Sequence, residues 1–265
     1  MTIAPGLCSI TFRALAGDEV LDVAARAGVE GIEWGADVHA PAGGGPAMAA
    51  LGARTRDAGL AVVSYGSYLG MAPAGDDDDR AVDAVLDTAE ALGAPMVRIW
   101  AELGVTPTSA PAERRRVTER TAALARAVLA RGMVPTLEFH PATLTETARS
   151  SNELIEAVGQ PELRTHWQPD PSLEATTALD ELVQVAPHLA HLHVFSWGPT
   201  GIDDRRPLTD GKSLWIPAIE LADRDGPPLT RYALCEYVRD DDPEQFVADA
   251  HVLRSWLDSI DRGRP

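Results

Sequence analysis

Four side chains able to bind a metal ion lie near the ends of four short apolar runs in the C-terminal half of the chain. They are Glu138 in LEFH, Gln168 in HWQPD, His193 in HLHVFSW and Glu236 in LCEYV. Each run has the length and composition of a β-strand. A parallel barrel gathers the ends of its strands at one face, so these side chains can form one site if the chain encodes such a barrel.

Apolar runs and amphipathic stretches alternate along the whole sequence, which is typical of repeated βα units and a parallel sheet. We expect eight strands, at residues 7–12, 31–35, 61–68, 96–101, 135–140, 164–170, 189–197 and 232–238. The expected helices lie at 18–27, 46–58, 77–92, 112–130, 145–158, 173–185, 214–222 and 243–259. Gly28, Gly59, Gly93 and Gly132 each follow a helical stretch, where glycine favours the conformation that ends a helix. Eight units close a TIM barrel, so we predict an α/β protein with a single (β/α)8 barrel.

Length and composition limit the class of protein. The chain has 265 residues, of which 45% are hydrophobic, and we expect one domain spanning residues 1–265. The sequence has no signal-peptide pattern and no run of about 20 apolar residues, so we expect a cytoplasmic protein without membrane contact. Cys8 and Cys235 fall in predicted strands and are expected to be buried rather than joined. A net charge of -17 argues against a nucleic-acid partner.

The predicted strand ends carry many polar side chains on the face that should point into the barrel, because strand side chains alternate in direction. This inward set is Glu33 and Gly35, Arg98 and Trp100, Glu138 and His140, His166, Gln168 and Asp170, His191, His193 and Phe195, and Leu234, Glu236 and Val238. Burying so many polar groups implies pairing, metal ligation or a polar ligand. Taken singly, a barrel glutamate is as often paired with an arginine or lysine as it is catalytic.

Two glutamates, one histidine and an amide or carboxylate oxygen form an oxygen-rich ligand set. Such a set favours Mn²⁺ or Mg²⁺, with Zn²⁺ and Co²⁺ as alternatives, and leaves positions open for substrate oxygens. A site rich in carboxylates and without thiolates suits Lewis-acid chemistry better than electron transfer.

Several motifs resemble those of the xylose-isomerase-like TIM-barrel superfamily, the sugar phosphate isomerase/epimerase family, which also contains inosose dehydratases and endonuclease-IV-type enzymes. They are GVEGIEWGADVH, VVSYGSY, APMVRIWAE, LEFH followed by TLTET, HLHVFSW, and LCEYVRDDDPEQFVADAHVLRSWL. The resemblance covers nearly the whole chain, and its most specific part is the terminal segment. It implies a TIM barrel that acts on a small sugar or polyol, and it allows a homo-oligomer.

In ketose 3-epimerases of this superfamily, a Glu after strand five, an Asp after strand six, a His after strand seven and a Glu after strand eight bind one divalent metal. The two glutamates also move the proton. Carried over by motif, the resemblance implies Glu138, His193 and Glu236 as ligands, with Glu138 and Glu236 as the catalytic pair. The sixth strand departs from the pattern, because Gln168 stands where an Asp is expected. We take Gln168 as the fourth ligand, and Asp170, two residues later on the same face, is the alternative.

The leading hypothesis is therefore a metal-dependent isomerase or epimerase that abstracts a proton next to the carbonyl of a keto sugar or polyol. Residues expected to contact the substrate are Glu33, His39, Tyr65, Arg98, Trp100, His140, Asp170, Trp197 and Lys212. A lyase or dehydratase of an inosose or 3-keto-glycoside would use nearly the same residues. A sugar-binding barrel without catalysis is the non-enzymatic alternative. A phosphodiesterase fits poorly, because the ligand set for a metal cluster is incomplete and the net charge is unfavourable.

Overall fold

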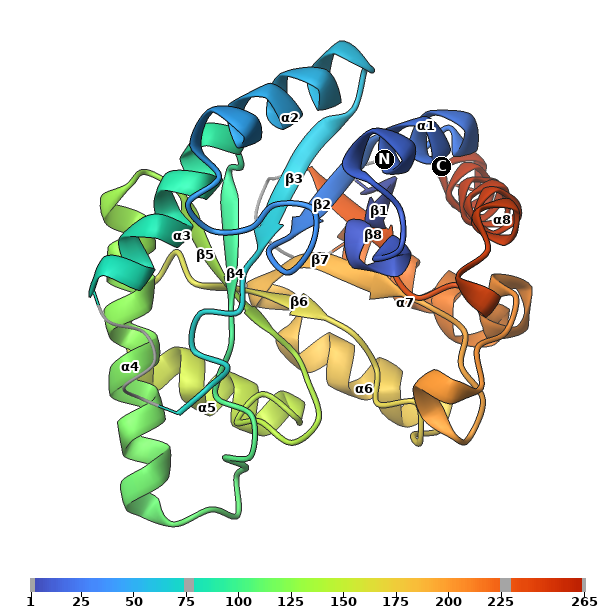
Figure 1. Cartoon of the computed structure of the whole chain (residues 1–265). Helices are drawn as coiled ribbons and strands as arrows, with labels where there is room; N and C mark the ends of the chain where they lie inside the picture. The colour runs from blue at the N-terminus through green and yellow to red at the C-terminus, as the bar shows by residue number, and fades with distance from the viewer. Residues whose placement is uncertain (1–2, 74–78, 225–229, 264–265) are drawn as a thin grey trace.

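The β-strands form a closed barrel in which each strand is parallel to its neighbours in sequence order (Figure 1). The computed structural model describes residues 3–73, 79–224 and 230–263. The strands are β1 (Ile3–Cys8), β2 (Gly31–Gly35), β3 (Ala61–Gly66), β4 (Met96–Ile99), β5 (Val134–Glu138), β6 (Arg164–Trp167), β7 (Leu189–Val194) and β8 (Arg231–Cys235). Pairing of β1 with β8 closes the barrel. The predicted (β/α)8 barrel is confirmed.

Helices surround the barrel and follow each strand in turn (Figure 1). Over the described residues they are α1 (Gly17–Ala27), α2 (Gly45–Asp57), α3 (Asp79–Leu92), α4 (Pro111–Ala130), α5 (Ala148–Val158), α6 (Ala175–Val185), α7 (Lys212–Arg224) and α8 (Pro243–Arg262). The predicted start of the third helix, at 77, lies outside the described residues. The fifth helix begins three residues later than predicted, because the hydroxyl of Thr147 accepts a hydrogen bond from Ser150 N and caps it.

The first strand is the largest error in the predicted boundaries. It was expected at 7–12, but β1 ends at Cys8 and Ser9–Phe12 forms a 3-10 helix (η1). Gly6 and Leu7 pair with β2, and Ile3 to Leu7 pair with β8, so the ladder lies before this helix. Apolar content alone does not show where a strand loses its neighbours.

Most later strands were predicted correctly at their start and too long at their end. The strand expected at 164–170 stops at Trp167, and the one expected at 189–197 stops at Val194. The extra residues keep the alternating pattern, but their backbone leaves the ladder and enters the loops at the C-terminal face. Those loops carry the polar side chains that made the pattern look continuous.

The apolar core lies between the barrel and its helices, while the middle of the barrel is polar. Trp34, Trp167 and Trp215 are fully buried in the outer layer. Charged and imidazole side chains of Glu33, Arg98, His166, His191 and His193 are 0% or 1% exposed inside the barrel. A polar interior of this kind requires that its charges be compensated by one another or by a bound ion.

Cys8 and Cys235 are both buried and unpaired with each other, as predicted. Among the helices of the described ranges, none is both long and apolar enough to cross a bilayer.

Close packing of α2 on the end of α3 depends on a glycine. A Cβ on Gly52 would lie 2.2 Å from the carbonyl oxygen of Leu92. We expect Gly52→Ala to lower the free energy of unfolding by about 1–3 kcal/mol, although alanine favours helix, because the backbones must separate. Gly17→Ala is the control, since its Cβ would meet only Leu51 Cδ1 at 3.4 Å. Urea denaturation of both variants checks the prediction, and a Gly52→Ala protein as stable as the wild type would contradict it.

Candidate active site

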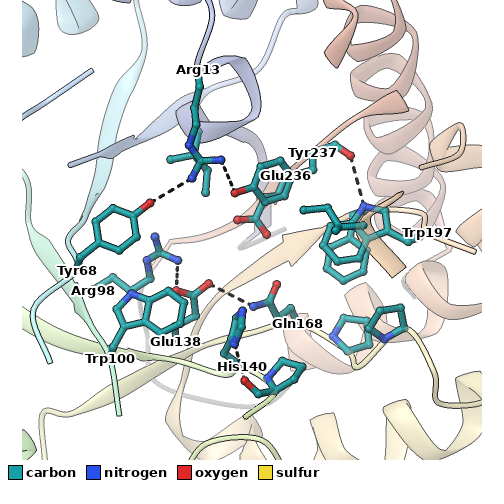
Figure 2. Close-up of a pocket in the computed structure, with 16 residues that line it drawn as sticks. Arg13, Tyr68, Arg98, Trp100, Glu138, His140, Gln168, Trp197, Glu236 and Tyr237 are labelled. Atoms are coloured by element: carbon teal, nitrogen blue, oxygen red, sulfur yellow. Dashed lines mark hydrogen bonds and ion pairs between the residues drawn. The ribbon is translucent and has the colours of Figure 1, made fainter. Parts of the chain in front are cut away.

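A cavity of about 320 Å³ opens at the C-terminal face of the barrel (Figure 2). This volume is in the range of small-ligand sites, and barrel enzymes place their active sites at this face. Its lining is Ile10, Arg13, Tyr68, Arg98, Trp100, Glu138, His140, Pro141, Gln168, Pro169, Pro171, Phe195, Trp197, Ile202, Glu236 and Tyr237. The floor is charged and the walls are aromatic and proline-rich.

Glu138 is the last residue of β5, and the TLTET segment that follows holds it in place. Thr145 Oγ1 donates to the carbonyl oxygen of Glu138 at 2.5 Å, and Thr143 Oγ1 donates to that of His140 at 2.7 Å. The two threonine hydroxyls also lie 2.8 Å apart. These bonds fold the loop back on the strand end, so the Glu138 side chain points into the barrel mouth.

His193 lies near the end of β7, and Glu236 directly follows β8. Glu236 N donates to the carbonyl oxygen of Val194 at 3.0 Å, which continues the pairing of the two strands past the ladder. His193 Nδ1 lies 3.5 Å from Glu236 Oε2 and 3.9 Å from Glu138 Oε1. One donor atom from each of the three side chains lies within 4.8 Å of the others.

Gln168 follows β6 and contacts Glu138 directly. Its amide nitrogen donates to Glu138 Oε1 at 3.3 Å, and the side chain is buried. Asp170 is turned away, because its carboxylate accepts a hydrogen bond from Ser172 N at 2.8 Å and borders a second, neighbouring cavity. Of the two alternatives for the fourth ligand, the structure places Gln168 beside Glu138. A half-turn of the amide would present its oxygen instead of its nitrogen.

Arg98 joins two buried carboxylates beneath the cavity. Its Nη1 forms an ion pair with Glu138 Oε2, and its Nε lies 3.4 Å from Glu33 Oε1. Glu33 Oε2 also accepts a hydrogen bond from Ser64 Oγ at 2.5 Å and lies 3.1 Å from His166 Nδ1. Burial disfavours the charged form of Glu33, but Arg98 and His193 outweigh it and hold the pKa of Glu33 well below its usual range.

The environments of Glu236 and His193 differ from that of Glu33. Burial raises the pKa of Glu236. The nearby His193 lowers this pKa in part, whereas the negative charge of Glu138 raises it further. Burial lowers the pKa of His193, but Glu236 and Glu33 more than compensate and raise it. Neither ring nitrogen of His193 has a hydrogen-bond partner among the described residues, although carboxylate oxygens lie 3.5 Å from each.

The donor set fits a divalent cation. The buried carboxylates of Glu33 and Glu138 share the guanidinium of Arg98, and a third buried carboxylate, of Glu236, lies 3.5 Å from His193 Nδ1. A divalent ion would balance the excess negative charge and would give His193 Nδ1 the partner that it lacks. Carboxylate oxygens with one imidazole nitrogen suit Mg²⁺ or Mn²⁺.

The residues expected to contact a substrate fall into two groups. Arg98, Trp100, His140 and Trp197 line the cavity, whereas Glu33, His39, Tyr65, Asp170 and Lys212 do not. His39 is bonded to Ser9 Oγ and Leu15 O, both at 3.1 Å. Tyr65 points outward and donates to the carbonyl oxygen of Ala40 at 2.7 Å. Lys212 is exposed at the first residue of α7.

Sequence reasoning did not place Arg13 and Tyr237 at the cavity. Arg13 directly follows the first expected strand, at 7–12, but what holds it at the cavity is its contact with Tyr237, which no local pattern shows. Tyr237 directly follows Glu236, and an aromatic residue immediately after a strand-end carboxylate was the available signal. Phe195 also lines the cavity and stacks on Trp197, with ring centroids 3.8 Å apart and planes 19° from parallel.

The family model described as xylose isomerase-like TIM barrel matches residues 21–256. Solved structures share the fold at low identity. A probable 3-DHS dehydratase, AsbF, from Bacillus anthracis has 19% identity and a TM-score of 0.77, covering 94% of this chain and 98% of its own. A xylose isomerase-like barrel protein from Mycobacterium smegmatis, in complex with magnesium, has 15% identity and a TM-score of 0.66, covering 97% of each chain. D-allulose 3-epimerase from Methylomonas sp. has 16% identity and a TM-score of 0.63, covering 96% and 98%. No curated protein matches the sequence.

Replacing Arg98, the cationic side chain buried beneath the cavity, tests its pairing with Glu33 and Glu138. We expect Arg98→Met to lower the free energy of unfolding of the metal-free protein by about 3–5 kcal/mol, because Glu33 and Glu138 lose their partner in a dry interior. Adding Glu33→Gln should restore part of this loss by removing one of the unpaired charges. Urea denaturation of the single and double variants measures both effects. A loss below about 1 kcal/mol for Arg98→Met would show that the pairing is not needed.

Proposed function

The chain belongs to the xylose isomerase-like TIM barrel family, and we propose that it is a divalent-metal-dependent isomerase or epimerase of a keto sugar or related polyol. The observation that carries the proposal is the arrangement of Glu138, His193 and Glu236. Two carboxylates from non-adjacent strands face one space at the cavity floor, with an imidazole nitrogen between them. An epimerase needs one proton-transfer group on each side of the substrate, whereas a 1,2-isomerase can work from one side.

In this proposal Glu138, His193 and Glu236 would hold the metal, and Gln168 would be the fourth ligand through its amide oxygen. A bound divalent ion supplies Lewis-acid polarisation of the carbonyl and neighbouring hydroxyl oxygens of a substrate. Mg²⁺ and Mn²⁺ are the preferred ions for these ligands, and a structural neighbour from Mycobacterium smegmatis contains magnesium.

Glu236 and Glu138 move the proton in this proposal. Glu236 directly follows β8 and lines the cavity beside His193. Glu138 reaches the cavity from β5, held by Arg98 and Gln168. One removes the carbon-bound proton next to the carbonyl, and the other returns a proton to the opposite face of that carbon or to the neighbouring carbon. The first outcome is epimerisation, and the second is isomerisation.

The walls bind the rest of the substrate. Trp100 and Trp197 line different sides of the cavity, and their rings suit stacking on a sugar ring (Figure 2). His140 lies against Trp100, with ring centroids 4.8 Å apart, and can bond a hydroxyl group. Apolar walls also limit water at the floor, which strengthens the electrostatic contacts there.

A dehydratase or lyase is the second candidate, favoured by the aromatic and proline-rich walls, which suit a bulkier substrate than a free ketose. After the same proton abstraction, the electron pair forms a carbon–carbon double bond and the C–O bond at the β-carbon breaks. The leaving oxygen takes a proton from a protonated carboxyl group and departs as water or an alcohol. The donor is whichever of Glu138 and Glu236 carries the abstracted proton.

Solvent exchange tests the proposal. In D₂O with Mn²⁺, we expect the wild-type protein to place deuterium next to the carbonyl of at least one member of a panel of ketoses and keto-glycosides, as seen by NMR. Glu138→Gln and Glu236→Gln should each lower the exchange rate roughly 100-fold or more, because each removes a proton-transfer group. Glu156→Gln, an exposed position on α5, is the matched control.

Exchange that persists in the double Glu138→Gln, Glu236→Gln variant would contradict these roles. Loss of water or alcohol from a panel member, detected by mass spectrometry, would assign the lyase reaction instead. A wild-type protein that binds no divalent ion in metal analysis would favour the sugar-binding barrel without catalysis.

The fourth ligand is tested by changing its charge. We expect Gln168→Asp to tighten Mn²⁺ binding roughly tenfold, because a carboxylate replaces a neutral amide beside the ion. Asp170→Asn should leave the affinity unchanged, because the Asp170 carboxylate turns toward Ser172. Calorimetric titration of both variants measures this, and weaker binding by Asp170→Asn would make Asp170 the ligand.

A further inference from the structure

Arg13 lies at the rim of the cavity, between two tyrosines from distant parts of the chain (Figure 2). Its Nη1 donates to the hydroxyl of Tyr237 at 2.7 Å, and its Nη2 donates to that of Tyr68 at 3.2 Å. Its Nε forms an ion pair with Asp37. The guanidinium is therefore fixed at three corners, above the carboxylates of the floor.

The fixed guanidinium keeps donor capacity for a ligand. An arginine has five N–H groups, and the three contacts just described use one on each nitrogen. One N–H remains on Nη1 and one on Nη2. A planar fork of two neighbouring N–H groups matches a carboxylate or a phosphate, and holding it in advance lowers the entropy lost on binding.

The charges of the cavity place an anion site at the rim rather than at the floor. Glu138 and Glu236 lie at the floor, and Glu33 adds a further carboxylate beneath it. Arg13 is the cationic side chain at the rim. A negative group of a substrate is therefore better placed beside Arg13 than at the floor.

We propose that Arg13 binds an oxyanion of the substrate, so that the substrate is a keto polyol carrying a carboxylate or a phosphate. The keto group of this substrate rests on the proposed function, whereas its anionic group rests on the contacts of Arg13 alone. Asp37 competes for the guanidinium in the unliganded protein. If Arg13 served only to tie the loops after β1, β3 and β8 together, it would not distinguish an anion from a neutral polyol.

Three probes with similar polyhydroxyl chains separate these roles without turnover: sorbitol, gluconate and sorbitol 6-phosphate. Calorimetry on the metal-free protein should show gluconate or sorbitol 6-phosphate binding roughly tenfold or more tightly than sorbitol, as a charge-assisted hydrogen bond implies. The tighter of the two identifies the oxyanion. Arg13→Met should abolish the preference, and Asp37→Asn should enlarge it by freeing the guanidinium.

Arg205→Met is the matched control. Arg205 lies over the same Tyr237 ring, 4.9 Å from its centroid, but does not line the cavity, so the preference should survive. A wild-type protein that binds the three probes alike or binds none, or an Arg13→Met variant that keeps the preference, overturns the proposal. The deuterium-exchange assay with neutral ketoses is a separate readout, so failure here and failure of the proposed reaction are distinguishable.

Discussion

The pairing of Arg98 with Glu33 and Glu138 is the interaction on which the rest of the barrel interior depends. A closed barrel with helices outside it leaves almost no water at its centre, and an isolated charge there would cost several kcal/mol. Arg98 spans the gap between β2 and β5 and compensates one carboxylate from each. The polar layer can therefore exist in a fold whose outer core is apolar.

This network explains how a glutamine can stand beside Glu138. The carboxylates of Glu138 and Glu236 share the floor with one guanidinium, and a further carboxylate at 168 would add negative charge to a dry site. A neutral amide adds a hydrogen bond to Glu138 without adding charge. The glutamine therefore leaves the charge balance between Arg98 and Glu138 unchanged.

The sequence allowed the barrel and its floor to be predicted, because both depend on local periodicity. Alternation placed Glu138 and His193 inward, and the start of β2 was correct to the residue. What failed depends on contacts between distant residues. Tyr65 was expected to contact a substrate, but a register irregularity between β2 and β3 pairs Glu33 with Ser64 and leaves Tyr65 facing the helices. Arg13 is held at the cavity by Tyr237, 224 residues away, and no local pattern reports such a contact.

The two arginines of the cavity differ in burial, and this difference determines whether each can exchange its present partner for a ligand. Arg98 is 1% exposed and fixed by carboxylates on two strands, so its charge is committed to the interior. Arg13 has a side chain that is 40% exposed and holds one partly exposed carboxylate. Because water still solvates it, exchanging that solvation for a ligand oxyanion costs less than breaking a buried pair. An arginine at the rim is therefore free to exchange its partner for a ligand, while the arginine at the floor maintains the charge balance of the interior.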